Sequence, residues 1–66
     1  MEIVINGESR EVPSSTSIGE LLRLLDLKED RVAIELNREI LRRDRWTETA
    51  LQPHDRLEIV QFVGGG

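Results

Sequence analysis

The apolar residues of the first twelve positions follow a strand-like pattern that is interrupted by one turn. Residues 2–6 form a β-branched run, and Asn6-Gly7 closes it. Asn and Gly tolerate the positive φ that both central positions of a type I′ turn require, so this dipeptide predicts a hairpin. Residues 8–12 then return as a second strand. That strand is expected to end at Pro13, because proline has no N–H to donate to a sheet ladder.

One amphipathic helix is predicted after this hairpin. Its apolar positions repeat with the i, i+3, i+4, i+7 spacing of a single buried helix face and are Ile18, Leu21, Leu22 and Leu25. Either Thr16 or Ser17 can accept a hydrogen bond from a free amide at the helix start. Glu20 lies three residues after Ser17, which is the spacing of a capping box.

The second half of the chain predicts further strands joined by turns. Residues 32–37 alternate apolar and polar side chains, residues 40–41 can form a short strand, and residues 57–63 form the last one. A helical turn is expected at residues 46–49 and another turn at residues 51–55. The first and last strands are the most apolar, so we expect them to be central and paired.

This order of elements predicts an α+β domain with the β-grasp arrangement. A mixed sheet of four to five strands, with one main helix packed across one face, buries the pattern most economically. We expect residues 1–63 to form this domain and residues 64–66 to be a flexible Gly-Gly-Gly tail.

Length, charge and composition narrow the functional classes. With 66 residues, the sequence has room for one domain, and it contains no cysteine for a disulfide or a thiolate metal site. Its formal net charge of −4 argues against nucleic acid or an anionic membrane as the main partner. It has no apolar run of about 20 residues and no signal-peptide pattern. We therefore expect a soluble, cytoplasmic protein that is a monomer on its own.

A group of arginines is the one basic feature of this acidic chain. Two interpretations remain open: a solvated surface, which is the commoner case, or a docking patch for an acidic partner. The residues are Arg38, Arg42, Arg43 and Arg45.

Few other side chains suggest chemistry. The single histidine, His54, is expected to be an exposed turn residue rather than a general base or metal ligand. Trp46 is expected to cover the edge of the core rather than to stack on a nucleotide. Glu29 and Asp30 are weak evidence for a cation site without further ligands. No glycine-rich phosphate loop precedes a helix, so an ATP site would have to lie on a partner.

The terminal Gly64-Gly65-Gly66 is the motif with the clearest chemical meaning. Three glycines add nothing to a core, and extended they reach about 10 Å beyond the last strand. Such a tail can enter a narrow cleft. The carboxylate of Gly66 is unreactive until it is activated, typically as an acyl-adenylate made from ATP. A sulfur nucleophile would then give a thiocarboxylate, whereas a lysine amine would give an isopeptide bond. The residues alone leave both products open.

The whole chain resembles the ThiS family of sulfur carrier proteins, which are ubiquitin-like β-grasp proteins of thiamin biosynthesis. The resemblance is carried by several segments together, namely Ile5-Asn6-Gly7-Glu8, residues 18–22, residues 32–37, Trp46 with Thr49 and Leu51, Asp55, residues 57–60, and Phe62-Val63-Gly64-Gly65-Gly66. Two positions depart from the family pattern. His54 stands where glycine is common, and Arg42-Arg43 replaces a stretch where Pro-Arg is frequent.

The resemblance implies a carrier and not an enzyme. An adenylating enzyme of the ThiF type would use ATP to activate Gly66, and sulfur would be installed there as a thiocarboxylate. A thiazole synthase of the ThiG type would then accept the sulfur. No cofactor is expected on the chain itself. A molybdopterin-type (MoaD-like) carrier, a ubiquitin-like modifier and an interaction module with an inert tail are the alternatives, and the ending Phe-Val-Gly-Gly-Gly favours ThiS.

An apolar docking patch is predicted beside the tail. If Leu57 and Ile59 face the helix, strand alternation turns Val60 and Phe62 to the other face. Exposed apolar side chains next to a reactive tail suggest a partner contact. The alternative is that neighbouring strand side chains or a curled tail cover both residues.

Overall fold

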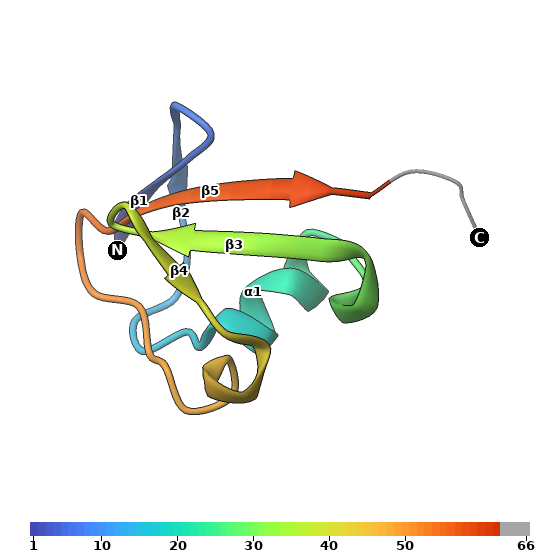
Figure 1. Cartoon of the computed structure of the whole chain (residues 1–66). Helices are drawn as coiled ribbons and strands as arrows, with labels where there is room; N and C mark the ends of the chain where they lie inside the picture. Colours follow the sequence, from blue (N-terminus) through green and yellow to red (C-terminus); the bar gives the residue numbers. More distant parts are fainter. Residues whose placement is uncertain (63–66) are drawn as a thin grey trace.

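Five strands and one α-helix are formed by residues 1–62, the part of the chain that the computed structural model describes. The strands are β1 (Glu2–Ile5), β2 (Glu8–Glu11), β3 (Val32–Leu36), β4 (Glu39–Leu41) and β5 (Arg56–Gln61). The helix is α1 (Ile18–Leu24), and two short 3₁₀ helices are η1 (Glu29–Arg31) and η2 (Arg43–Arg45). In Figure 1, α1 lies against one face of the sheet.

The sheet is mixed, with the order β2-β1-β5-β3-β4. β1 and β5 pair in parallel at the centre, and the other neighbours are antiparallel. The predicted β-grasp fold is therefore confirmed, including the central pairing of the first and last strands. The chain crosses from β1 to its parallel neighbour β5 through the helix and the β3–β4 hairpin (Figure 1).

The β1–β2 hairpin and the helix cap form as their sequences predict. Asn6 and Gly7 have φ values of 50° and 83°, as a type I′ turn requires. The Ser17 hydroxyl accepts from the Glu20 amide at 3.1 Å, and the Glu20 carboxylate accepts from the Ser17 amide at 2.9 Å. This reciprocal capping box satisfies two amides that the first helical turn leaves unpaired.

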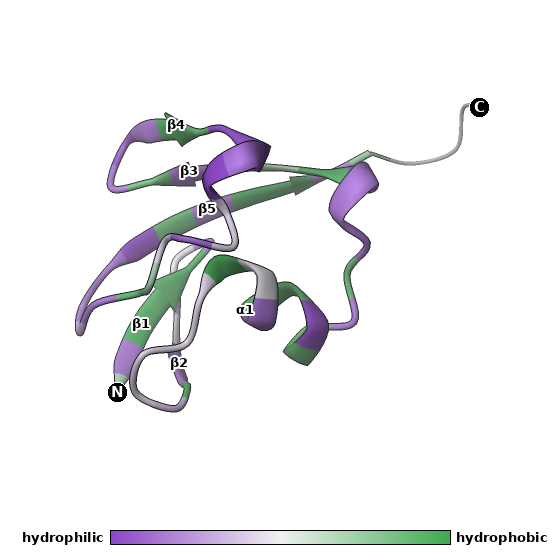
Figure 2. Ribbon diagram, turned by 90° about the horizontal axis from the view of Figure 1, so that it is seen from below, coloured by the Kyte–Doolittle hydropathy of each residue, from purple (hydrophilic) through white to green (hydrophobic). Residues whose placement is uncertain are grey.

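The core lies between α1 and the face of the sheet that α1 covers. It consists of twelve buried apolar residues, which are Ile3, Ile5, Val12, Ile18, Leu21, Leu22, Val32, Ile34, Trp46, Leu51, Leu57 and Ile59. In Figure 2, which is coloured by hydropathy, β1 is largely green (hydrophobic), whereas the short helices η1 and η2 are purple (hydrophilic). Trp46 is only 2% exposed, and its Nε1–H donates to the Leu41 carbonyl at 3.0 Å. It is therefore part of the core edge, as predicted.

The first four predicted strands lie within one residue of the observed bounds, and two other segments differ more. The helical turn expected at residues 46–49 begins earlier, as η2 at Arg43–Arg45, with Trp46 as its C-terminal cap. The Thr49 hydroxyl donates to the Arg45 carbonyl at 2.7 Å, so it closes the segment rather than belonging to a new helix. β5 begins at Arg56 and ends at Gln61. Val63, predicted as the last strand residue, lies outside the described residues.

Candidate functional site

β5 is the element that leads to the predicted glycine tail. Gly64, Gly65 and Gly66, the predicted site residues, lie outside the described residues. The part of the site that the structure does describe is the strand that precedes them, its supports and its two faces. These features decide how the end of the domain is presented.

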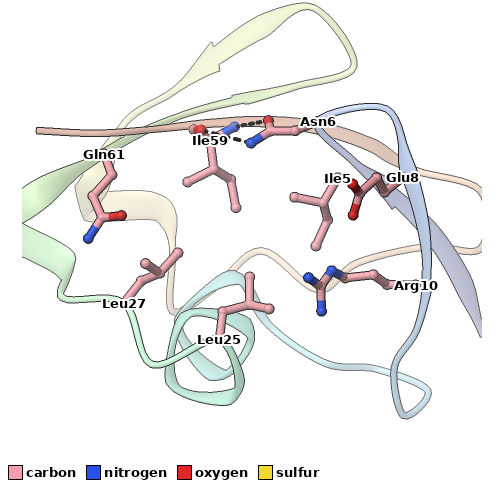
Figure 3. Close-up of a pocket in the computed structure, with 8 residues that line it drawn as sticks. All are labelled: Ile5, Asn6, Glu8, Arg10, Leu25, Leu27, Ile59 and Gln61. Atoms are coloured by element: carbon pink, nitrogen blue, oxygen red, sulfur yellow. Dashed lines mark hydrogen bonds between the residues drawn. The ribbon is translucent and has the colours of Figure 1, made fainter.

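β5 is held from its β1 side by a side chain where the backbone of β1 runs out. The parallel pairing ends at Ile5 opposite Leu57, because β1 then turns at Asn6. Two residues further along β5, at Ile59, the Asn6 side chain provides the hydrogen bonds in place of the β1 backbone. Its Oδ1 accepts from the Ile59 amide at 2.8 Å, and its Nδ2 donates to the Ile59 carbonyl at 3.1 Å (Figure 3). One amide side chain thus reproduces a backbone pair of the sheet.

A second asparagine fixes the other end of β5. The Asn37 Oδ1 accepts from the Arg56 amide at 2.9 Å, and its Nδ2 donates to Asp55 Oδ1 at 3.0 Å. Asp55 in turn accepts from the Gln52 amide at 2.8 Å. Both asparagines sit in turns at positive φ, a conformation that Asn tolerates better than most residues. The sequence analysis treated Asn6 and Asn37 as turn residues and missed this second role.

On its other side, β5 is paired with β3 as far as the end of the described chain. The register runs from Leu36 opposite Leu57 to Val32 opposite Gln61. The Phe62 amide then donates to the Arg31 carbonyl at 2.7 Å. The backbone is therefore held by β3 and by the Arg31 carbonyl as far as Phe62, the last described residue.

Val60 and Phe62 lie on the face of β5 that α1 does not cover. Val60 is 58% exposed and Phe62 is 54% exposed, whereas Leu57 and Ile59 on the opposite face are buried. The predicted alternation of faces is thus present, and neighbouring side chains do not cover either residue. Their role in partner docking stays a prediction.

The same face carries a third large apolar side chain that sequence reasoning missed. Ile40 on β4 is 80% exposed, the highest value among the large apolar residues of the described chain. A shallow hollow of about 180 Å³ lies between Ile40 and Val60, with the small side chain of Ala33 in the strand between them. β4 has only three residues, and two adjacent ones, Ile40 and Leu41, are apolar, so its sequence does not show which of them faces the core.

A larger hollow of about 350 Å³ opens on the helix side, beyond the end of α1. Figure 3 shows its apolar floor and its polar rim. Leu25, Leu27, Ile5 and Ile59 form the floor, and Asn6, Glu8, Arg10 and Gln61 form the rim. The floor residues are largely core side chains, so this hollow is the open end of the helix–sheet layer.

The arginines form no single patch. Arg38 and Arg42 flank β4 at its two ends, about 13 Å apart at the rise of a strand. Arg42 pairs with Asp44 at 3.7 Å and Arg45 with Glu48 at 3.8 Å, while the Arg43 guanidinium lies 5.5 Å from the centre of the Trp46 ring. These contacts favour the solvated-surface interpretation.

Residues 1–62 were predicted to offer little for metal binding, and the positions of their possible ligands are as follows. No group of three or more histidine, aspartate or glutamate residues in this range is placed to hold a metal ion. His54 is exposed in its turn, 3.8 Å from the Glu2 carboxylate, as expected for a surface residue. Within the same range, no helix has the length and apolar character to cross a bilayer.

Together, the fold and the site define a small β-grasp domain whose supported last strand leads into a run of glycines. The family model of the ThiS family matches residues 3–66. The sulfur carrier protein ThiS of Bacillus subtilis (strain 168) is 38% identical over 63 residues, covering 94% of this chain and 96% of that protein. The chain belongs to the ThiS family.

A solved structure and a second kind of relative agree with this assignment. The crystal structure of the thiamine biosynthesis protein ThiS from Geobacter metallireducens superposes with a TM-score of 0.85, at 33% identity and full coverage of both chains. A thiazole synthase of Paramagnetospirillum magneticum (strain ATCC 700264 / AMB-1) is 41% identical over all 66 residues. The chain spans 20% of the length of that protein and of a second thiazole synthase that it matches.

Proposed function

We propose that this chain is a sulfur carrier protein that supplies sulfur for thiazole formation in thiamin biosynthesis. The observation that carries the proposal is the ThiS family match over residues 3–66, which includes the glycine run. The relatives named as ThiS and as thiazole synthases support thiamin rather than molybdopterin as the pathway. The chain acts as a protein substrate, and the enzymes are its partners.

The proposed reaction sequence begins at Gly66. A carboxylate oxygen of Gly66 attacks the α-phosphorus of ATP in a ThiF-like partner, and pyrophosphate leaves. A sulfide-level donor then attacks the carbonyl carbon, forming a C–S bond as the C–O bond to AMP breaks. The product is a thiocarboxylate on Gly66, which is the nucleophile that a ThiG-like thiazole synthase consumes.

In this proposal the domain and the tail have different roles: the domain holds the last strand in place, and the tail carries the reactive end. The two asparagines, β3 and the Arg31 carbonyl hold the chain as far as Phe62, so the described strand that precedes the tail is fixed. The tail glycines, Gly64 and Gly65, would enter the partner's active site. Val60 and Phe62 would contact the partner beside that entrance, because they are exposed on the strand that leads there.

Support for a thiazole synthase as partner comes from the relatives. Two thiazole synthases each contain a segment similar to this whole chain within one longer polypeptide. A carrier-like segment and a synthase in one chain would keep the sulfur donor at a high effective concentration. A separate carrier has to reach the synthase by a specific but transient interface.

The intact mass of the protein tests the proposal most directly. Purified from cells with a working sulfur pathway, the chain is expected to gain the mass difference of one sulfur replacing one oxygen, located in the C-terminal peptide. Deletion of Gly66 should abolish this gain and also fail to restore thiazole-independent growth to a strain without its own carrier. Covalent attachment to lysines of other proteins would instead indicate a modifier. An unchanged mass, with no ATP-dependent activation by a ThiF-like enzyme, would overturn the proposal.

A further inference from the structure

Glu35 on β3 and Glu58 on β5 face each other directly on the side of the sheet that lacks the helix. Like charges in directly opposed positions destabilise a sheet. Among residues 1–62, neither carboxylate has an ion-pair partner within 4.0 Å. This arrangement places two like charges side by side on an exposed face of the sheet.

The two carboxylates form the boundary between two different hollows. On one side they share a hollow with Val4, Arg38 and Arg56. On the other side they line the apolar hollow between Ile40 and Val60, where they are the sole charged groups in the lining. The outer face of β5 therefore presents, in order toward the tail, Arg56, Glu58, Val60 and Phe62.

The apolar hollow fits a long side chain with a charged tip. Its floor is the Ala33 methyl group, and its walls are the exposed side chains of Ile40 and Val60. Lysine and arginine bury their methylene stems on apolar surfaces while the charged ends stay near polar groups. A stem lying across Ala33 would bring its cation to Glu35 and Glu58 and relieve their repulsion.

We propose that this face receives a lysine or arginine of the thiazole synthase to which the chain delivers sulfur. The proposal rests on the proposed function and adds the chemistry of the partner's surface: a basic side chain among aliphatic ones, next to the cleft that admits the tail. Charge complementarity to the opposed carboxylates and the position of the hollow on the strand that leads to the tail are the arguments for it. A partner cation between Glu35 and Glu58 would favour docking, because it places an opposite charge beside both carboxylates.

The test measures binding of the thiazole synthase of the same organism to the purified chain and, in parallel, thermal unfolding of each variant. Glu58→Lys is expected to weaken binding by about tenfold or more while leaving the melting temperature unchanged or higher. Added salt should weaken binding of the wild type more than that of Glu58→Lys. Glu39→Lys is the matched control. It makes the same charge change on β4, beside Ile40 in sequence but on the opposite face, and should change binding by less than about twofold.

Ala33→Phe provides a second, uncharged test. The larger ring fills the hollow and should weaken binding without destabilising the domain, because Ala33 is exposed. If Glu58→Lys and Ala33→Phe bind the synthase as tightly as Glu39→Lys does, the inference is overturned. The proposed sulfur-carrier function would still stand. No binding of the wild-type chain to the synthase would contradict the proposed function itself. Weaker binding to the ThiF-like enzyme alone, with binding to the synthase unchanged, would also overturn the inference.

Discussion

The side-chain amide of Asn6 pairs with both backbone polar groups of Ile59, 53 residues further along the chain. It extends the parallel β1–β5 ladder beyond the point where the backbone of β1 turns away. The strand that leads to the tail is thus fixed from both sides at Ile59, by Asn6 and by β3. An asparagine in a hairpin turn has become part of the support of the proposed sulfur-carrying end.

Replacement of Asn6 by glycine should loosen β5 without straining the turn. Glycine accepts the φ of 50° at this position, so the turn itself is not strained. Two part-buried hydrogen bonds disappear, and we expect a loss of about 1–3 kcal/mol in the free energy of unfolding. Amide hydrogen exchange should speed up at Ile59 more than at Ile34, which β4 and β5 flank. Unchanged protection of the Ile59 amide would show that the clamp contributes nothing.

His54 occupies a backbone conformation that favours glycine. Its φ is 71°, while its amide donates to the Glu2 carbonyl at 2.7 Å. The left-handed region costs a residue with a Cβ roughly 1–2 kcal/mol. Replacing His54 by glycine removes this cost, but the greater freedom of glycine in the unfolded chain offsets part of the gain in stability. His54→Gly should therefore stabilise the protein by about 0.5–1 kcal/mol in thermal or urea unfolding.

The matched control for this position is His54→Ala. It removes the imidazole and its exposed 3.8 Å contact with Glu2 but keeps the Cβ. Such exposed pairs contribute little, so this variant should be no more stable than the wild type. Equal stabilisation by alanine and glycine would assign the effect to the imidazole rather than to the backbone. The positive φ of His54 also gives a physical reason for the glycine that is common at this position in the family that the chain resembles.

Local pattern predicted most of the fold because its signals lie close together in sequence. Asn6-Gly7 determined the hairpin, and Ser17 with Glu20 determined the helix start, each within a few residues. The helical turn was misplaced because its position depends on where Trp46 enters the core, which is a tertiary contact. The clamp between Asn6 and Ile59 joins distant segments, so no local pattern contains it.

The candidate site also has features that local sequence predicts and features that it does not. The exposure of Val60 and Phe62 followed from alternation along one strand whose buried face was clear. Ile40 and the opposed pair of Glu35 and Glu58 were missed, because their relation requires the register of β5 on β3 and of β3 on β4. Register between strands from different parts of the chain is set by packing and turns together.

The capping box predicts a pH dependence of stability. The Ser17 backbone N–H, followed by the Ser17 side chain, lowers the pKa of Glu20 from its ordinary value of 4.5. A carboxyl with a lower pKa in the folded state contributes stability that is fully present above pH 4.5 and is lost as pH falls through the folded value. Glu20→Gln keeps the cap geometry but cannot titrate. Its stability difference from the wild type should therefore shrink on acidification below pH 4.5.

Chemical denaturation at a series of pH values measures this difference. Ser17→Ala is the companion variant, because it removes the hydroxyl that accepts from the Glu20 amide. It should cost about 1 kcal/mol near neutral pH, the usual value for loss of an N-terminal cap. A difference between the wild type and Glu20→Gln that stays constant across the acidic range would rule out the proposed linkage.

The exposed apolar residues of β5 should separate folding from partner binding. Val60→Asp and Phe62→Asp each place a charge on a side chain that is more than half exposed, so we expect changes within about 0.5 kcal/mol in unfolding free energy. Both should reduce adenylation by the ThiF-like enzyme or binding by the thiazole synthase, because a charge then has to be desolvated in an apolar contact. Leu57→Asp is the control on the buried face of the same strand, and it should unfold the domain. If circular dichroism shows that Val60→Asp or Phe62→Asp also unfolds it, that residue is structural and does not belong to the docking patch.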